Sequence, residues 1–370
     1  MKLSVRGGSW VLPLLAAALG CSSERVGQDD PSGAAGGSAQ SEAGVVELSV
    51  SPDARTFVEL SEPSRVELDG DGSKSLAWDL ALQGRDVFSN GGISGPGNTS
   101  AFGPLAPPTF LSDTAPEVPI LLKDRAGGAL LDWYDYGGET HQLFSRYHVY
   151  GLRDGARLFK LQILSYYGEQ LGAPVAALYR IRWAEVSDAA VGETQELIEI
   201  DATAGGDSTD DRQSSACVDL VSGNVTPLTP DEAALSDAWH VCFRRESVAV
   251  NGGLSGSRGV EAVDLDADLT ASETEDEIQA RTEDSELPRF AGADYEALTA
   301  DTLSWATDGV ATAFARRWLE PGTDPIELSD SVWLVLAADG ASKYLLKFES
   351  LNGNLGSDTA TLSLRAKAVR

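Results

Sequence analysis

The chain has 370 residues, 42% of them hydrophobic, and a formal net charge of -29 at pH 7. This length suffices for two domains, or for one large domain with a substantial core. The acid excess argues against nucleic acid or anionic lipid as a partner, because both need a basic surface.

The first 20 residues predict a lipoprotein signal peptide. Lys2 and Arg6 carry positive charge, an apolar run follows over residues 10–19, and the segment ends in Ala-Leu-Gly before Cys21. We therefore expect cleavage before Cys21, lipidation of its thiol, and attachment to the outer membrane or cell surface by the lipid alone. An ordinary signal peptide cleaved nearby, or a membrane anchor, are the alternatives. The apolar run is about half of the ~20 residues that a spanning helix needs.

After a Gly- and Ser-rich tether over residues 21–44, the sequence repeats itself. Trp78-Asp-Leu-Ala-Leu and Asn90-Gly-Gly-Ile-Ser-Gly recur as Trp239-His-Val-Cys-Phe and Asn251-Gly-Gly-Leu-Ser-Gly, 161 residues later. Further on the offset becomes 185, so the second copy carries 24 extra residues, which include an acidic stretch over 272–286. We predict two modules, 45–202 and 216–370, joined by a polar linker over 203–215.

Most of the predicted secondary structure is strand. Segments such as Leu158–Ile163 and Tyr344–Phe348 are rich in β-branched and aromatic residues, and Asn-Gly or Asp-Gly pairs supply turns. One helix is expected after Thr229, where Pro230 and Glu232 complete a capping box, and another over Glu275–Arg281. We therefore predict an all-β fold of two tandem β-sandwich-like modules with few short helices.

Two cysteines remain after Cys21. Cys217 and Cys242 each lie in a strand-like segment, and neighbouring antiparallel strands would bring them together. In an exported protein such a pair predicts a disulfide. The alternative is two separately buried thiols.

The repeated sequence motifs of the first module resemble those of the HmuY family of haem-binding surface lipoproteins. The resemblance rests on Trp78-Asp-Leu-Ala-Leu, Asn90-Gly-Gly-Ile-Ser-Gly, Trp133-Tyr-Asp-Tyr, Tyr147-His-Val-Tyr and Phe159-Lys-Leu-Gln-Ile-Leu-Ser-Tyr-Tyr. It covers nearly all of the first module and, more loosely, the second. It implies an all-β, lipid-anchored protein that takes up haem outside the cell for iron acquisition. Haem or a haemoprotein would then be the ligand, and an outer-membrane receptor a further partner.

Members of this family coordinate haem iron through two axial side chains, usually histidine. This chain has His141, His148 and His240, and the repeat places Ile326, Trp333 and Asp79 at the equivalent positions. Neutral imidazole is a good iron ligand, so the three histidines are candidate haem ligands. On one straight strand His141 and His148 would lie ~23 Å apart. The alternative places His141 in a loop and His148 on a solvent-facing strand position.

Aromatic residues separate the two modules. Six tyrosines of the first module are replaced by other residues in the second, so a ligand surface is expected in the first module, at Tyr134, Tyr136, Tyr147, Tyr150, Tyr166 and Tyr167. The tryptophans Trp78, Trp133, Trp239 and Trp318 recur in both modules and are interpreted as packing residues rather than as a ligand platform.

A weaker candidate is a calcium site. Asp264, Asp266, Asp268 and Glu275 stand at positions 1, 3, 5 and 12 of a calcium-loop spacing, although Leu269 replaces the turn glycine. The Asn-Gly-Gly segments lack the lysine of a phosphate-binding loop and are interpreted as turns.

No nucleophile or acid–base constellation emerges, so we expect a binding protein and not an enzyme. Haem or a related porphyrin is the leading ligand. The first alternative is a surface interaction protein on the same scaffold, without haem ligands, that binds a protein or glycan. The second is a calcium-stabilised structural module.

Overall fold

The computed structural model describes residues 43–370 apart from 69–71, 138–139, 141, 205–212 and 271. The predicted signal peptide, the predicted lipidation site Cys21, the tether up to residue 42 and the candidate ligand His141 thus lie outside the described residues. Residues Gln40–Arg370 form one compact unit. Its regular structure is mostly strand, which confirms the all-β prediction. Within the described ranges, no helix has the length and apolar character needed to cross a membrane.

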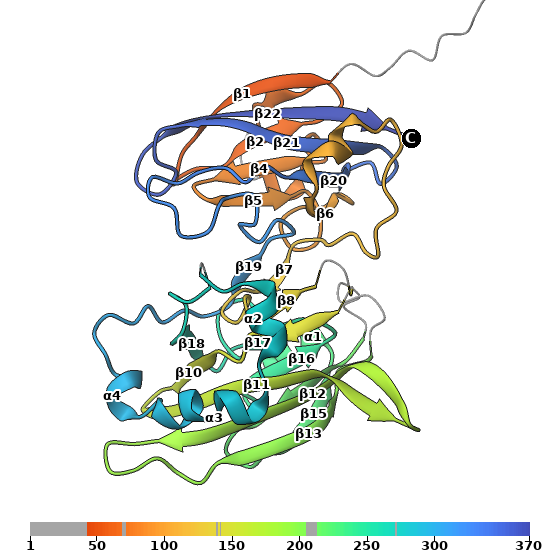
Figure 1. Ribbon diagram of the computed structural model, residues 1–370. Helices are drawn as coiled ribbons and strands as arrows, with labels where there is room; N and C mark the ends of the chain where they lie inside the picture. The colour runs from red at the N-terminus through yellow and green to blue at the C-terminus, as the bar shows by residue number, and fades with distance from the viewer. Residues whose placement is uncertain (1–42, 69–71, 138–139, 141, 205–212, 271) are drawn as a thin grey trace, which may run out of the picture. The chain divides into compact units, whose positions relative to one another are not determined.

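The first set of strands comes from the two ends of this unit, residues 43–124 and 312–370, which we call the split lobe (Figure 1). It contains a five-stranded sheet of order β1-β22-β21-β20-β6 and a four-stranded sheet of order β3-β2-β4-β5. All strand pairs are antiparallel. The elements are β1 (Gly44–Val50), β2 (Thr56–Glu59), β3 (Ser64–Val66), η1 (Gly72–Lys74), β4 (Leu80–Gln83), β5 (Asp86–Ser89), β6 (Ser100–Leu105), η2 (Pro107–Leu111), β20 (Val332–Leu336), β21 (Lys343–Asn352) and β22 (Ala360–Val369).

The second set comes from residues 128–308, which we call the continuous lobe. It repeats the same plan, with a five-stranded sheet of order β13-β12-β11-β10-β18 and a four-stranded sheet of order β15-β14-β16-β17. A two-stranded hairpin, β8·β9, and four short helices are added. The elements are β8 (Tyr134–Tyr136), β9 (Leu143–Ser145), β10 (Val149–Asp154), β11 (Arg157–Gln170), β12 (Ala173–Val186), β13 (Gln195–Asp201), β14 (Ser215–Val218), β15 (Val225–Leu228), α1 (Pro230–Leu235), β16 (Val241–Arg244), β17 (Ser247–Val250), β18 (Glu261–Asp264), α2 (Glu275–Ala280), α3 (Glu283–Gly292) and α4 (Tyr295–Leu298).

The strand pairing does not follow the two predicted modules. In the split lobe, β1 and β6 of the first module flank β20, β21 and β22 of the second. In the continuous lobe, β10 of the first module, which is followed in the sheet by β11 and β12, pairs with β18 of the second. Strand β13, which was placed at the end of the first module, occupies the sheet position that β1 occupies in the other lobe. The sheets therefore combine halves of the two sequence copies, and 45–202 does not close on itself.

The chain passes between the lobes through one pair of strands. Strand β7 (Arg125–Gly127) pairs antiparallel with β19 (Gly309–Ala311), and Ala126 faces Val310 in the register. We call this pair the crossover.

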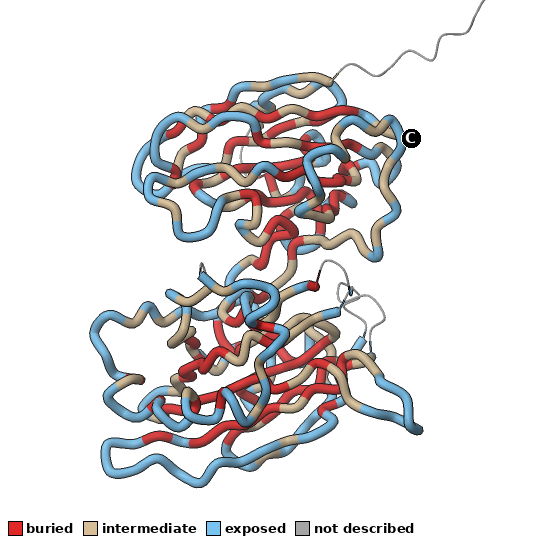
Figure 2. Tube along the Cα trace, in the orientation of Figure 1, coloured by how far each residue is buried: buried red, intermediate tan, exposed pale blue. Residues whose placement is uncertain are grey.

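Each lobe has its own apolar core between its two sheets, seen as the buried segments in Figure 2. One core combines β1, β2, β4 and β5 with β20, β21 and β22, and the other combines β10, β11 and β12 with β14, β16 and β17. The four repeated tryptophans are at most 1% exposed, which confirms that they are packing residues.

The repeated Asn-Gly-Gly segments are turns, held in the same way in both copies. The side-chain amide of Asn90 donates to the carbonyl oxygens of Ser75 and Trp78, and that of Asn251 donates to the equivalent Ser236 and Trp239. Glycine is required here: a Cβ on Gly92 would lie 1.8 Å from the carbonyl oxygen of Asp124, and one on its counterpart Gly253 would lie 1.9 Å from that of Asp308. Both glycines also have positive φ.

The other local predictions are confirmed. Helix α1 begins after Thr229 with the expected capping box, and α2 covers Glu275–Ala280. Cys217 and Cys242 lie opposite each other on β14 and β16 and form a disulfide.

Candidate functional site

His148, at the start of β10, is buried and enclosed by carboxylates. Its side chain is fully shielded from solvent; Nδ1 lies 2.7 Å from Oδ2 of Asp264 and Nε2 lies 3.0 Å from Oε1 of Glu273. Since ionised carboxylates only accept hydrogen bonds, both ring nitrogens donate and the ring is an imidazolium. His148 is therefore neither solvent-facing nor free to ligate iron.

Electrostatics maintain this arrangement. Burial alone would lower the pKa of His148, but the hydrogen bonds to Asp264 and Glu273 outweigh it and raise the pKa above its ordinary value. Burial opposes ionisation of Glu273, yet hydrogen bonds from His148 and Arg146 lower its pKa to about 2. Arg146 and Arg281 lie 2.7 and 2.5 Å from the Glu273 carboxylate. The Glu273 charge is thus shared among three cationic side chains.

The segment after β18, residues 265–300 apart from 271, contributes Glu273 and covers a polar face of β11 and β12. Lys160, only 2% exposed, donates from Nζ to the carbonyl oxygen of Phe290 at 2.7 Å. Arg182 donates to Oε1 of Gln162 at 2.7 Å, and its guanidinium lies 5.0 Å from the centre of the Phe290 ring. The 24 extra residues of the second copy thus lie in a segment that packs over strands β11 and β12 of the first copy.

This buried polar face is not apparent from the sequence. In Leu158-Phe-Lys-Leu-Gln-Ile, Lys160 and Gln162 alternate with apolar residues, a pattern that normally indicates a strand with one face in solvent. The signal that could have indicated otherwise is the complementary charge of the acidic insertion.

His240 is also unsuited to iron ligation. Its side chain is completely buried, and Nδ1 accepts a hydrogen bond from the backbone N–H of Leu220 at 3.2 Å, with Oδ1 of Asp219 beside it at 3.0 Å. Nε2 makes no hydrogen bond and lies 3.4 Å from Oδ2 of Asp154. Burial, and then the charge of Arg258, lower the pKa of His240, so the ring is neutral. It is a structural acceptor, closed to a ligand the size of a porphyrin.

The six tyrosines expected at a ligand surface are mostly part of the continuous-lobe core. Tyr150 and Tyr166 are 2% and 6% exposed, and Tyr134 and Tyr167 pack against the same core. Tyr147 is half-buried, and Tyr136, at the end of β8, is the most exposed of the six at 38%. Burial raises the pKa of Tyr166 to about 12. Four of the six thus pack in or against the core, and the set does not form an aromatic platform.

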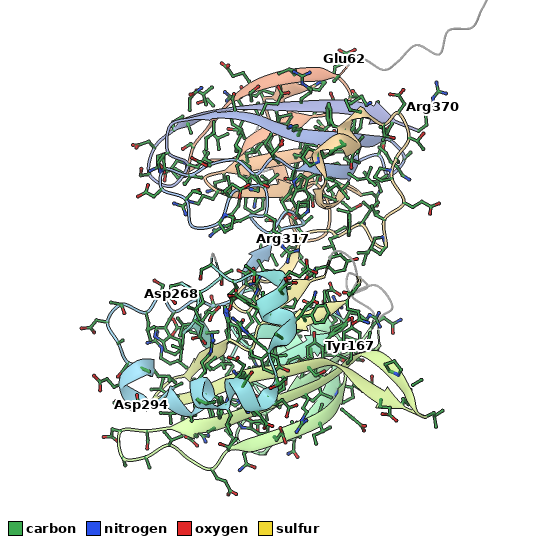
Figure 3. The ribbon with its side chains drawn as sticks, in the orientation of Figure 1. Glu62, Tyr167, Asp268, Asp294, Arg317 and Arg370 are labelled. Atoms are coloured by element: carbon green, nitrogen blue, oxygen red, sulfur yellow. A yellow bond between two sulfur atoms is a disulfide. The ribbon has the colours of Figure 1, made fainter. Side chains whose placement is uncertain are left out.

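The predicted calcium residues do not converge. Asp264 binds His148, and Asp266 accepts a hydrogen bond from the backbone N–H of Val149 at 2.8 Å. Asp268, labelled in Figure 3, and Glu275 are exposed. No group of three or more His, Cys, Asp or Glu forms a metal site in the described part of the chain. The calcium prediction is therefore wrong, because two of its carboxylates already have partners in the fold.

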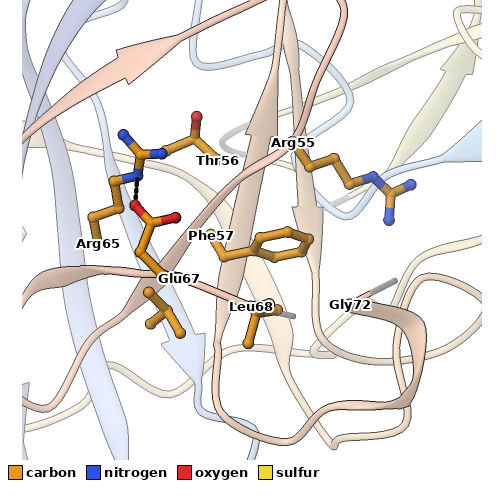
Figure 4. Close-up of a pocket in the computed structure, with 8 residues that line it drawn as sticks. Arg55, Thr56, Phe57, Arg65, Glu67, Leu68 and Gly72 are labelled. Atoms are coloured by element: carbon orange, nitrogen blue, oxygen red, sulfur yellow. Dashed lines mark ion pairs between the residues drawn. The ribbon is translucent and has the colours of Figure 1, made fainter. Parts of the chain in front are cut away.

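Two surface hollows do not offer a haem site, the larger because of its lining residues and the smaller because of its volume. The larger, about 360 Å³, is an open hollow beside β2 and β3, where Arg65 pairs with Glu67 (Figure 4). No histidine, cysteine or tyrosine is among its described lining residues. The smaller, next to the crossover at Trp133 and Tyr134, has room for about 50 Å³. Sites for cofactor-sized ligands usually enclose ~300–1,000 Å³.

Comparison with known proteins gives little further guidance. No family model matches the chain, and no curated protein matches it. A solved structure from Bacteroides vulgatus, described as a proposed HmuY-like haem-binding protein, is similar at 15% identity over 44% of this chain and 87% of that chain. Its TM-score is 0.14, which is too low to support an argument about the ligand.

Proposed function

We propose that this chain is a lipid-anchored extracytoplasmic binding protein, without catalytic activity, that recognises a protein partner on an HmuY-like scaffold. The observation that carries this proposal is the environment of His148, whose two ring nitrogens are each hydrogen-bonded to a carboxylate. Ligation of iron would require removal of a proton and separation of His148 from two anions in a buried site. His240 is equally inaccessible.

The choice of a protein over a glycan rests on the aromatic residues. Sugar platforms need exposed aromatic faces, whereas Tyr150 and Tyr166 are buried. The hairpin of β11 and β12 instead presents an exposed apolar tip, Leu171. Its strands have 14 residues each, against 10 in the equivalent β21 and β22.

Haem is the second candidate, because the repeated words of the first module resemble those of haem-binding lipoproteins. A titration with haemin separates the two. The chain from Ser22 onward is mixed with haemin, and the Soret and visible bands are recorded. We expect the broad spectrum of free or adsorbed haemin. A sharp, red-shifted Soret band that saturates at one equivalent would overturn the proposal, and loss of that band in His141→Ala would identify the ligand.

The anchor is tested separately. Cells that express the full chain are labelled with a radioactive fatty acid, and Cys21→Ser is the matched control. Label on the wild type and none on Cys21→Ser is the expected result. Equal labelling of both, or of neither, would contradict lipidation at Cys21.

A further inference from the structure

We infer that the two sequence copies can fold only together. Each half of one copy packs against a half of the other copy, and not against the other half of its own. The chain is in effect an exchanged dimer of one module, fused end to end. This inference concerns assembly and does not depend on the ligand.

The first observation is the crossover itself. Ala126 and Val310, which face each other in the register, are 184 positions apart, and so are the neighbouring Asp124 and Asp308. The offset becomes 185 only beyond this point, because Ala313 and Trp318 are one residue further apart than Ala129 and Trp133. Asp124 and Asp308 are equivalent because they accept hydrogen bonds from Ser89 and Val250, which are 161 apart as in the repeat. Equivalent residues of the two copies therefore pair with each other in opposite directions. This is the geometry expected where two identical chains cross through a two-fold axis and exchange their second halves.

The second observation is the pair of buried carboxylates beside the crossover. Asp124 accepts hydrogen bonds from the backbone N–H of Ser89, in its own copy, and of Ala313, in the other copy. Asp308 accepts from the N–H of Val250, in its own copy, and of Ala129, in the other. Ala129 and Ala313 are again 184 apart. At both ends of the crossover, a buried carboxylate of one copy thus accepts one hydrogen bond from its own copy and one from the other copy.

The third observation is the composition of the sheets. In the split lobe β1 pairs with β22 over seven residues and β20 pairs with β6, and both pairs join different copies. In the continuous lobe β10 pairs with β18, again across copies. A single copy of the repeat would leave these strand edges and half of each core exposed to water.

The inference is tested by cutting the folded chain. A protease site is inserted within residues 205–212, the protein from Ser22 onward is purified and cleaved, and the product is analysed by gel filtration with mass detection. We expect the two fragments, the first of which retains β13, to elute together at the mass of the uncut chain and to separate only in denaturant. Cys217 and Cys242 lie in the same fragment, so no disulfide holds the fragments together. Elution as two half-sized species would overturn the inference.

Paired cysteines distinguish exchange from simple association of two closed modules. Val45 lies opposite Arg365 in the β1·β22 pair, and Arg180 is the equivalent of Arg365 in the first copy. After oxidation and cleavage, Val45→Cys with Arg365→Cys should link the fragments on a non-reducing gel, whereas Val45→Cys with Arg180→Cys should form no disulfide. The reverse result would show that each copy closes on itself.

Discussion

His240 occupies in the continuous lobe the position that Asp79 occupies in the split lobe, and the two side chains accept equivalent hydrogen bonds. Asp79 accepts from the backbone N–H of Leu60 at 2.8 Å, and His240 accepts from that of Leu220 at 3.2 Å. Asp79 accepts a second bond, at 2.7 Å, from the N–H of Ala338. A histidine that the sequence alone presents as a candidate metal ligand is thus a structural acceptor in a duplicated strand junction.

Replacement of either acceptor by alanine should destabilise the fold. His240→Ala leaves one buried N–H without a partner and Asp79→Ala leaves two, at about 1–3 kcal/mol for each group. We therefore expect a lower melting temperature for both variants, with the larger decrease for Asp79→Ala. Thermal unfolding followed by circular dichroism measures this. An unchanged melting temperature for His240→Ala would show that the Leu220 bond is not structural.

The two described histidines should give opposite pH dependences of stability. The folded-state pKa of His148 is raised, so its contribution is complete below its ordinary pKa of 6.5 and is lost as pH rises through the folded value. Glu273 contributes above its ordinary 4.5, and this contribution is lost as pH falls towards 2. The melting temperature of His148→Gln should therefore differ most from wild type between pH 4.5 and 6.5, and less at higher pH.

His240→Gln is the matched control for that experiment. Because the folded pKa of His240 is lowered, its contribution is lost as pH falls through 6.5. The wild-type advantage over His240→Gln should therefore grow with pH, whereas the advantage over His148→Gln should shrink. Parallel pH profiles for the two variants would contradict the protonation states assigned to both rings.

The local features of this fold could be predicted from sequence because each depends on neighbouring residues. The capping box at Thr229, the Asn90 and Asn251 turns and the packing tryptophans all follow from short patterns. The exchange of halves could not be predicted in this way. Equivalent strands of two similar copies have the same edges and apolar faces, so sequence pattern alone does not decide which copy each strand joins.

The candidate site was predicted less well, for a related reason. The family resemblance pointed to His148, and the calcium-loop spacing to Asp264 and Asp266, as residues with metal-binding chemistry. Neither indicated that Asp264 would bind His148 or that Asp266 would bind Val149. The carboxylates lie on strand β18 and the loop that follows it, and His148 lies more than 100 residues earlier in the chain. Their pairing follows from the exchange of halves, which places β18 of the second copy beside β10 of the first.

Loss of the disulfide should weaken the continuous lobe without abolishing its fold. Cys217 and Cys242 are 25 residues apart, and closure of a loop of this size stabilises a protein by about 3 kcal/mol in the chain-entropy model. We expect Cys217→Ala with Cys242→Ala to unfold at a lower denaturant concentration than wild type. Reduction of the wild-type protein should reproduce the decrease and leave the double variant unchanged. A reductant effect on the variant would indicate another cause.

Asp308 should make the folded protein less stable as pH rises, whereas an ordinary surface aspartate does not. Burial raises its pKa to about 6, so between pH 3.8 and 6 the folded state retains a proton that the unfolded state has released. Stability must fall over that interval as pH increases. Asp308→Asn carries no such cost, although its single amide oxygen replaces two acceptor oxygens for the N–H groups of Ala129 and Val250.

The measurement is the difference in melting temperature between Asp308→Asn and wild type across this pH range. We expect the difference to shift in favour of the variant as pH rises from 4 towards 7, whatever its starting value. Asp124→Asn should shift in the same direction, because burial also raises the pKa of Asp124. A difference that stays constant with pH at both positions would mean that solvent reaches the carboxylates, and hence that the crossover is open.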